Sequence, residues 1–372
     1  MCEHCMNRRE FGVRTTAGSK IFADFIPDQD AVVAAKLTDA GAVMVGKTGL
    51  HELAYGVTSD NPHFGAIRNP RRPDRSPGGS SGGSGVAVAT GMALMATGTD
   101  TGGSIRIPAS FCGVVGLKPT YGAVDRSGVQ PLGFSLDHIG PLAACVADAR
   151  ISFEAMAPGR RREAAPPSVR GVRIGWPENY YFARAAGDVK AAVEKAARQA
   201  EQIGARVIPV RVPDVEALNA AGRVILLAEA SALYEPYLAR RGDFGADVLA
   251  LLDQGRLVPA TDYVNAQRLR KALAAEFREL FDRIDCLFTP TTPITAPRIG
   301  QKEVELDGAR EDARIATTRL VRGFNVLGFP ALSIPCGHSA DGMPIGLQMI
   351  ARPFEENLLL ALGEALEAQL AE

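Results

Sequence analysis

The chain has 372 residues, of which 46% are hydrophobic and 22% are charged, a balance typical of a globular protein that buries a large core. The formal net charge is −1, which gives no support to binding of nucleic acid or of an anionic membrane. The apolar runs are too short and too interrupted to span a bilayer, and no charged start is followed by an apolar stretch of the kind found in secretory signals. We therefore expect a cytoplasmic protein.

The first predicted elements are a helix over Ile26–Ala40 and a short buried strand over Ala42–Val45. Residues 41–48, GAVMVGKT, match the phosphate-binding pattern G-x-x-x-x-G-K-[ST] in every letter. In a nucleotide-binding loop of this type the strand precedes the first glycine, and the four variable residues form the loop. Here those four residues are the predicted strand and a helix precedes them, so the match does not indicate nucleotide binding.

The segment Ser76–Ala109 holds two serines in glycine-rich surroundings, Ser80 and Ser104. Between them, Gly82–Gly98 has no charge and is rich in small apolar residues, which predicts a helix inside the protein. A tight turn is predicted over Gly98–Gly103. Backbone N–H groups in such a turn converge on an anion, or on an oxygen that is becoming one, and a serine beside them is placed to attack a carbonyl. A glycine-rich turn with a capping serine has the same local pattern, so the residues alone leave both interpretations open.

Two other catalytic patterns are not supported. Residues 79–83, GSSGG, fit the G-x-S-x-G nucleophile elbow, but that motif needs a strand directly before it, and the preceding RRPDRSP is not a strand. No Ser-His-Asp constellation stands out either. The histidines considered lie in separate segments, at His51, His63, His138 and His338.

Strands and helices alternate in the remainder of the chain, which predicts an α/β fold with a mixed central β-sheet covered by helices on both faces. We expect one domain over residues 1–372, with residues 1–11 atypical. The predicted helices are Ala147–Met156, Val189–Ile203, a helical region over Val224–Gln267, Asp262–Arg283 and Glu355–Leu370. The predicted strands are Val172–Trp176, Val207–Val210, Asp285–Pro290, Ala331–Ile334 and Gly346–Ile350.

The cysteines do not form a metal-binding pattern. A structural zinc site needs a second pair at matching spacing, and Cys2-Glu-His-Cys5 is the one C-x-x-C present. The other cysteines lie in apolar surroundings and are expected to be buried thiols. They are Cys112, Cys145, Cys286 and Cys336. The sequence thus predicts no metal and no cofactor.

Several long motifs make the sequence resemble the amidase signature family. They are GGSSGGS at 78–84, DTGGSIRIP at 100–108, CGVVGLKPTYG at 112–122, SLDHIGP at 135–141, NVLGFPALSIPCG at 325–337 and PIGLQ at 344–348. The two serines also lie 24 residues apart, as they do in the family. The resemblance covers nearly the whole chain.

The resemblance implies a Ser-Ser-Lys mechanism of amide hydrolysis. By this likeness Ser104 is the nucleophile and Ser80, which follows a cis peptide in the family, relays the proton. The oxyanion hole is assigned to the N–H groups of Thr101, Gly102 and Gly103, together with the nucleophile's own N–H. A neutral lysine completes the triad as the base, and burial is what lowers the pKa of such a lysine.

The family lysine has no counterpart at the expected position. Counting back about 75 residues from Ser80, as the family spacing implies, reaches Cys5, and residues 1–10 do not resemble the family. We expect a truncated or misread N-terminus and therefore impaired activity. A genuine fragment, or substitution by another lysine, with Lys20 and Lys47 nearest, are the alternatives.

Three functions remain open at this point. The first is an amidase acting on a small-molecule amide through an acyl-serine intermediate. The second is the glutamine-hydrolysing component of a tRNA-dependent amidotransferase, although the residues aligned with its glutamine-binding Arg and Asp are neutral, Ala250 and Thr318. The third is a non-catalytic amidase paralogue. A homodimer is left open, and no nucleic-acid or membrane partner is expected.

Overall fold

The computed structural model describes residues 13–159 and 168–370. Its centre is an eight-stranded mixed sheet with the strand order β3-β5-β4-β11-β12-β8-β6-β7. Neighbouring strands are antiparallel except that β6 runs parallel to both β7 and β8. The strands are β3 (Met95–Asp100), β4 (Val115–Lys118), β5 (His138–Ala143), β6 (Arg173–Pro177), β7 (Arg206–Val210), β8 (Cys286–Pro290), β11 (Ala331–His338) and β12 (Pro344–Ile350).

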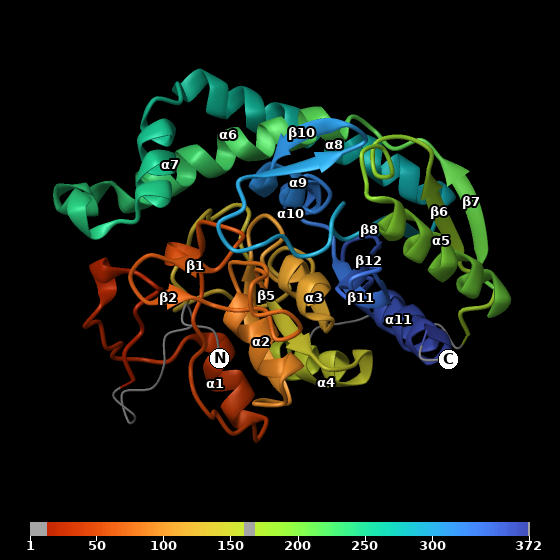
Figure 1. The fold of residues 1–372 in the computed structure, drawn as a ribbon, viewed down its shortest axis with the longest axis horizontal. Coiled ribbons are helices and arrows are strands. Elements are labelled where there is room, and N and C mark those ends of the chain that lie inside the picture. Colours follow the sequence, from red (N-terminus) through yellow and green to blue (C-terminus); the bar gives the residue numbers. More distant parts are fainter. Residues whose placement is uncertain (1–12, 160–167, 371–372) are drawn as a thin grey trace.

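Helices cover both faces of this sheet, as the sequence predicted, and Figure 1 shows α6, α7 and α8 gathered on the opposite side of the molecule from α1, α2 and α4. The helices are α1 (Val32–Asp39), α2 (Gly82–Ala89), α3 (Arg106–Cys112), α4 (Val146–Met156), α5 (Gly187–Gln202), α6 (Val215–Tyr234), α7 (Ala246–Arg256), α8 (Ala260–Arg283), α9 (Ala313–Thr318), α10 (Arg322–Leu327) and α11 (Glu356–Leu370). Two short hairpins, β1 (Asp60–Asn61) with β2 (Gly65–Ala66) and β9 (Glu303–Leu306) with β10 (Ala309–Asp312), lie outside the main sheet. None of the helices in the described ranges is long and apolar enough to cross a membrane.

The two-residue period of the strands divides the core between the faces. On β8, Cys286 and Phe288 pack into the cluster that holds α1, α4, α5 and α11, whereas Leu287 packs into the cluster of α6, α8 and α10. On β12, Met349 and Ile350 divide in the same way. The strands therefore read as continuous apolar runs, because both of their faces are buried.

Helix α2 is held against β3 by serine hydroxyls. Ser81 Oγ accepts a hydrogen bond from the Thr99 N–H at 3.2 Å and donates to the Thr99 carbonyl at 3.3 Å. Ser84 Oγ donates to the Thr97 carbonyl at 2.8 Å. These bonds fix the start of α2, directly after Ser80, to the strand that leads to Ser104.

The helix predicted over Gly82–Gly98 is only half right. Helix α2 ends at Ala89, and Gly91 adopts a left-handed conformation with φ 72° that stops it. The chain then turns and enters strand β3 at Met95. An uncharged run of small residues fits a buried strand as well as a buried helix, so composition did not separate the two.

Two other predictions near the N-terminus differ from the structure. The predicted buried strand over Ala42–Val45 is wrong: no strand is assigned there, and Val43 and Val45 are 85% and 75% exposed. The helix predicted from Ile26 begins only at Val32. Since residues 41–48 are neither a strand-flanked loop nor followed by an α-helix, they lack the surroundings of a phosphate-binding loop.

Close backbone packing in the sheet predicts a sharp effect at Gly140. A Cβ at this position would lie 2.0 Å from the Leu117 carbonyl oxygen on the neighbouring strand. We expect Gly140→Ala to lower the free energy of unfolding by at least about 1–3 kcal/mol, because the backbone must move to admit the methyl group. Urea denaturation measures this change.

Gly187 at the start of α5 offers a matched control. Nothing lies within 4 Å of a Cβ placed there. Gly187→Ala is expected to change the free energy of unfolding by less than about 1 kcal/mol. Equal effects of the two substitutions would contradict the proposed packing at Gly140.

Candidate functional site

The fold brings the two serine-containing segments together. The Ser81 N–H donates to the Ser104 carbonyl at 3.3 Å, and the His51 N–H donates to the Ser80 carbonyl at 3.1 Å. The peptide bond between Gly79 and Ser80 is cis. Ser80 is fully buried, and Ser104 is 5% exposed. The segment before α2 and the segment before α3 thus form one site.

The carboxylate of Asp100 organises the turn that carries Ser104. It accepts hydrogen bonds from the Gly103 N–H at 2.7 Å and from the Ile105 N–H at 3.1 Å. Arg106 adds two more, from Nε at 3.0 Å and from Nη2 at 2.9 Å. Both side chains of this ion pair are fully buried. The residues on either side of Ser104 are therefore anchored to one buried charge.

The buried charges extend to distant parts of the chain. Arg106 Nη1 donates to Gln348 Oε1 at 2.6 Å and Nη2 donates to Asn325 Oδ1 at 2.7 Å, while Asn325 Nδ2 donates to Asp100 Oδ1 at 2.8 Å. Burial by itself would raise the pKa of Asp100, but the Arg106 charge and hydrogen bonds outweigh it and hold the pKa below its usual value. Burial also lowers the pKa of Lys118, which lies beside this network on β4.

The turn that leads into Ser104 has backbone N–H groups available as donors, but one of those expected from the sequence is already occupied. The N–H groups of Thr101, Gly102 and Ser104 make no hydrogen bond to any acceptor in residues 13–159 or 168–370. The N–H of Gly103, in contrast, is occupied by Asp100. The assignment of Gly103 as an oxyanion-hole donor is therefore corrected, because its N–H already has a carboxylate acceptor. Gly103 instead supplies a φ of 123°, which favours glycine.

Ser104 opens onto a cavity of about 310 Å³. Thr101 and Gly102 line it beside Ser104, and Tyr55 and Arg322 face it from other segments. Its apolar part comes from Leu132 and from residues of α6 and α7, namely Leu226, Leu227 and Leu251. The cavity thus combines a serine hydroxyl, backbone donors and an apolar wall.

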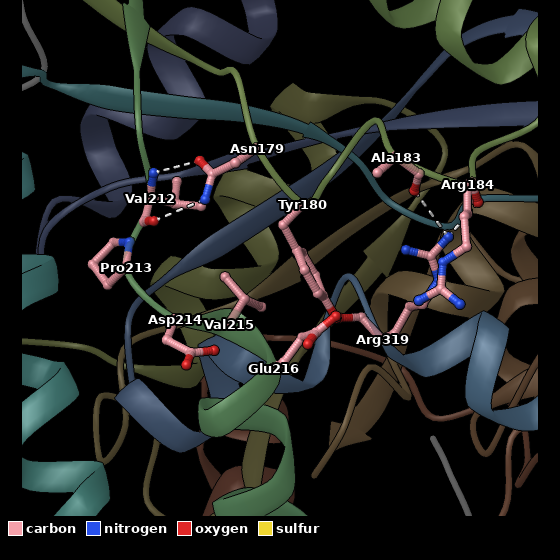
Figure 2. A pocket seen from close by; sticks show the side chains of 10 residues that line it. All are labelled: Asn179, Tyr180, Ala183, Arg184, Val212, Pro213, Asp214, Val215, Glu216 and Arg319. Atoms are coloured by element: carbon pink, nitrogen blue, oxygen red, sulfur yellow. Dashed lines mark hydrogen bonds between the residues drawn. The ribbon is translucent and has the colours of Figure 1, made fainter.

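A larger cavity, shown in Figure 2, has a different character. It lies where β6 and β7 lead into the following segments and is lined by Asn179, Tyr180, Ala183, Arg184, Val212, Pro213, Asp214, Val215, Glu216 and Arg319. Asn179 bonds to both backbone groups of Val212, and Arg319 donates to the carbonyls of Ala183 and Arg184. These polar groups support loops, and the lining has no serine, cysteine, lysine or histidine. The smaller cavity at Ser104 is therefore the candidate active site.

The lysine candidates differ in their surroundings. Cys5, the position expected for the family lysine, lies outside the described residues. Lys20 is exposed, whereas Lys47 is partly buried and its Nζ bonds to Thr15 Oγ1. Ser80 Oγ is buried and makes no hydrogen bond within the described parts of the chain. No lysine in those parts therefore bonds to the Ser80 hydroxyl.

The other catalytic patterns considered from the sequence stay unsupported. His51 contacts Asp247 at 3.1 Å, His63 contacts Glu52 at 2.9 Å, and His138 faces the Leu136 carbonyl at 2.7 Å. Each of these three imidazole rings thus has partners other than the two serines.

No group of three or more His, Cys, Asp or Glu side chains in the described ranges is arranged to hold a metal. Cys112, Cys286 and Cys336 are buried as predicted, and burial raises the pKa of each thiol. The prediction is wrong for Cys145, which is only partly buried.

Comparison with known proteins shows that this chain is similar to amidases in sequence and in fold. The family model described as Amidase matches residues 9–360. The chain is 41% identical over 400 residues to the A-type subunit of glutamyl-tRNA(Gln) amidotransferase from Koribacter versatilis, covering 97% of this chain and 82% of that one. It is 42% identical over 373 residues to an amidase of Pseudomonas putida, covering 96% and 78%. A solved amidase crystal structure superposes with a TM-score of 0.93 at 37% identity, covering 99% of this chain and 83% of that one.

The buried ion pair predicts a large loss of stability when Asp100 is neutralised. We expect Asp100→Asn to lower the free energy of unfolding by about 3–5 kcal/mol, because Arg106 is left as a buried charge without its counter-ion. Asp253→Asn, which breaks the exposed pair with Arg241, is the control and should leave the unfolding midpoint unchanged. A small effect of Asp100→Asn in urea denaturation would contradict this account.

The same pair predicts a pH dependence. The pKa of Asp100 is lower in the folded protein than in the unfolded chain, so its contribution to stability is fully present above about pH 4 and is lost as the pH falls toward the folded value. Thermal unfolding followed from pH 7 to pH 3 should therefore show a smaller loss of stability in Asp100→Asn than in the wild type. Parallel curves would show that other carboxylates dominate acid unfolding.

Proposed function

The chain belongs to the amidase family, and we propose that Ser104 is the nucleophile with which it hydrolyses a carbon–nitrogen amide bond. The observation that carries this proposal is the position of Ser104. It lines the cavity directly after a turn whose available N–H groups face no acceptor in the described chain. Such donors stabilise the oxygen of a tetrahedral intermediate, and loss of one typically lowers the rate by about 10²–10³-fold.

In this mechanism Ser104 Oγ forms a bond to the amide carbonyl carbon and passes its proton to Ser80. The carbonyl oxygen gains the negative charge, which the N–H groups of Thr101, Gly102 and Ser104 stabilise. As Ser80 takes this proton, it passes its own to the base behind it. Collapse of the intermediate breaks the carbon–nitrogen bond, and the base returns the proton through Ser80 to the leaving nitrogen, which departs as ammonia or an amine. Water then attacks the acyl-serine, releases the acid and returns a hydrogen to Ser104.

Ser80 fits the relay role because the N–H of the next residue, Ser81, bonds to the Ser104 carbonyl, and because the buried Ser80 hydroxyl makes no hydrogen bond to the described chain. A relay requires a base behind it. Of the two candidates named from the sequence, we favour Lys47, because it is partly buried and its Nζ bonds to Thr15 Oγ1, whereas Lys20 is exposed.

The glutamine-hydrolysing component of an amidotransferase is the second candidate, favoured by the similarity to the Koribacter versatilis protein. In that case the chain would act on glutamine and pass ammonia to partner proteins. Thr318, aligned with the family's Asp, lines the Ser104 cavity and has no charge to hold an ammonium group. We therefore place this function second. Glutamine hydrolysis that rises on addition of such partner proteins would move it first.

The proposed assembly and location have less support. A homodimer and a cytoplasmic location remain predictions from the sequence. Light scattering of the purified chain tests the assembly, and fractionation of the producing cells tests the location.

Replacing the nucleophile should abolish turnover. We expect Ser104→Ala to reduce hydrolysis of simple aryl and aliphatic amides by at least about 10³-fold, and to abolish labelling by a fluorophosphonate probe. Ser127→Ala, at an exposed serine, is the control and should retain both. Wild-type activity in Ser104→Ala would refute the assignment of the nucleophile.

The choice of base is tested by a pair of lysine variants. If Lys47 serves Ser80, Lys47→Met lowers kcat by about 10²-fold or more and shifts the pH–rate profile, while Lys20→Met leaves both unchanged. Circular dichroism confirms that both variants are folded. If neither substitution changes kcat, the base is another group, and Lys47 is only structural.

A further inference from the structure

A cationic side chain lies directly beside the reacting turn. Arg322, the first residue of α10, packs so closely that a Cβ placed on Gly102 would lie 3.7 Å from Arg322 Nε. Its Nη2 donates to Thr318 Oγ1 at 2.9 Å, but its buried Nε makes no hydrogen bond to the described residues. Burial, followed by the charge of Arg223, lowers the pKa of Arg322 to about 10, so the group is still charged at neutral pH.

Two more donors face the same cavity. Tyr55 is 6% exposed, and its hydroxyl finds no partner in the part of the chain that is described. Arg223 on α6 is exposed and bonds to Gln254 Oε1 at 3.3 Å. Tyr55, Arg223 and Arg322 all line this one cavity. A buried hydroxyl without a partner is costly unless a ligand supplies one.

Two carboxylates line the same cavity, Asp247 and Asp312. Asp247 contacts His51 at 3.1 Å, and Asp312 lies 3.7 Å from Arg314 and caps α9. Neither Arg322 nor Arg223 forms an ion pair with residues 13–159 or 168–370. The lining thus holds three arginines, Arg223, Arg314 and Arg322, against the two aspartates, which leaves one net positive charge beside Ser104.

We propose that this cavity selects amides whose acyl group ends in a carboxylate, such as the half-amides of short dicarboxylic acids. Arg322 and Arg223 bind the carboxylate, and the Tyr55 hydroxyl donates a further hydrogen bond to it. A guanidinium suits a carboxylate because its N–H groups form two parallel hydrogen bonds. This inference rests on the proposed function, because the carboxylate is positioned relative to a carbonyl at Ser104.

The experiment compares substrates that differ only in charge. Succinamate and glutaramate are each assayed against the neutral diamide of the same length. We expect kcat/KM for the better half-amide to exceed that of its diamide by about 10- to 100-fold, the range of a charge-assisted hydrogen bond. Glutamine should be used less well than glutaramate, because its α-ammonium group would face Arg322 and Arg223.

Variants assign the preference to the arginines. Arg322→Gln is expected to bring the half-amide to diamide ratio close to one, mainly through KM, and Arg223→Gln and Tyr55→Phe to reduce it less. The diamide rates report any general damage to the turn, so the ratio separates recognition from folding. Arg256→Gln, at an exposed arginine on α7, should keep the wild-type ratio. A wild-type ratio of one or less, or a ratio unchanged in Arg322→Gln, overturns the inference while leaving amide hydrolysis intact.

A binding measurement separates this inference from the proposed function. If no amide is hydrolysed, calorimetry with Ser104→Ala compares binding of glutaramate and glutaramide. Preferential binding of glutaramate that disappears in the Ser104→Ala, Arg322→Gln double variant supports the cavity's charge selectivity even though hydrolysis has failed. Equal binding of the two compounds overturns it.

Discussion

The site depends on a single buried ion pair between Asp100, at the end of β3, and Arg106, at the start of α3. The two residues bracket Ser104, and the carboxylate also holds the Gly103 N–H. Because the pair is fully buried, each charge needs the other and the amides of Asn325 and Gln348. A strand, a helix and two distant segments must therefore fold together before Ser104 is held in place. The site forms only when the surrounding fold is complete.

The sequence predicted the fold correctly where the spacing of apolar residues matches the faces that the structure buries. Helix α5 keeps one apolar face, and strands such as β8 are apolar throughout because both faces are buried. Prediction failed at Ala42–Val45, where an apolar run is exposed, and at Gly82–Gly98, where Gly91 ends a helix in the middle of a uniform composition. Composition predicted neither outcome, because it specifies neither whether an apolar run is buried nor the residue at which a helix ends.

The candidate site was predictable only in part. The glycine-rich motifs identified Ser80 and Ser104 because the chemistry and the unusual backbone lie in one continuous segment. The motif did not reveal that Asp100 takes the N–H of Gly103. Arg322 was not singled out either, since more than two hundred residues separate it from Ser104 and a lone arginine in sequence is usually a surface charge. Contacts across such separations require the fold.

The hydrogen bonds of the Ser81 hydroxyl also affect the edge of the central sheet. Strand β3 stands at one end of the described sheet, and Ser81 Oγ occupies both the N–H and the carbonyl of Thr99 on the side away from β5. Those are the groups through which a strand of another molecule would add to the sheet. The side chain that follows Ser80 thus blocks pairing of another strand at Thr99. Exchange of Ser81 for a residue without a hydroxyl would free both backbone groups at this edge of the sheet.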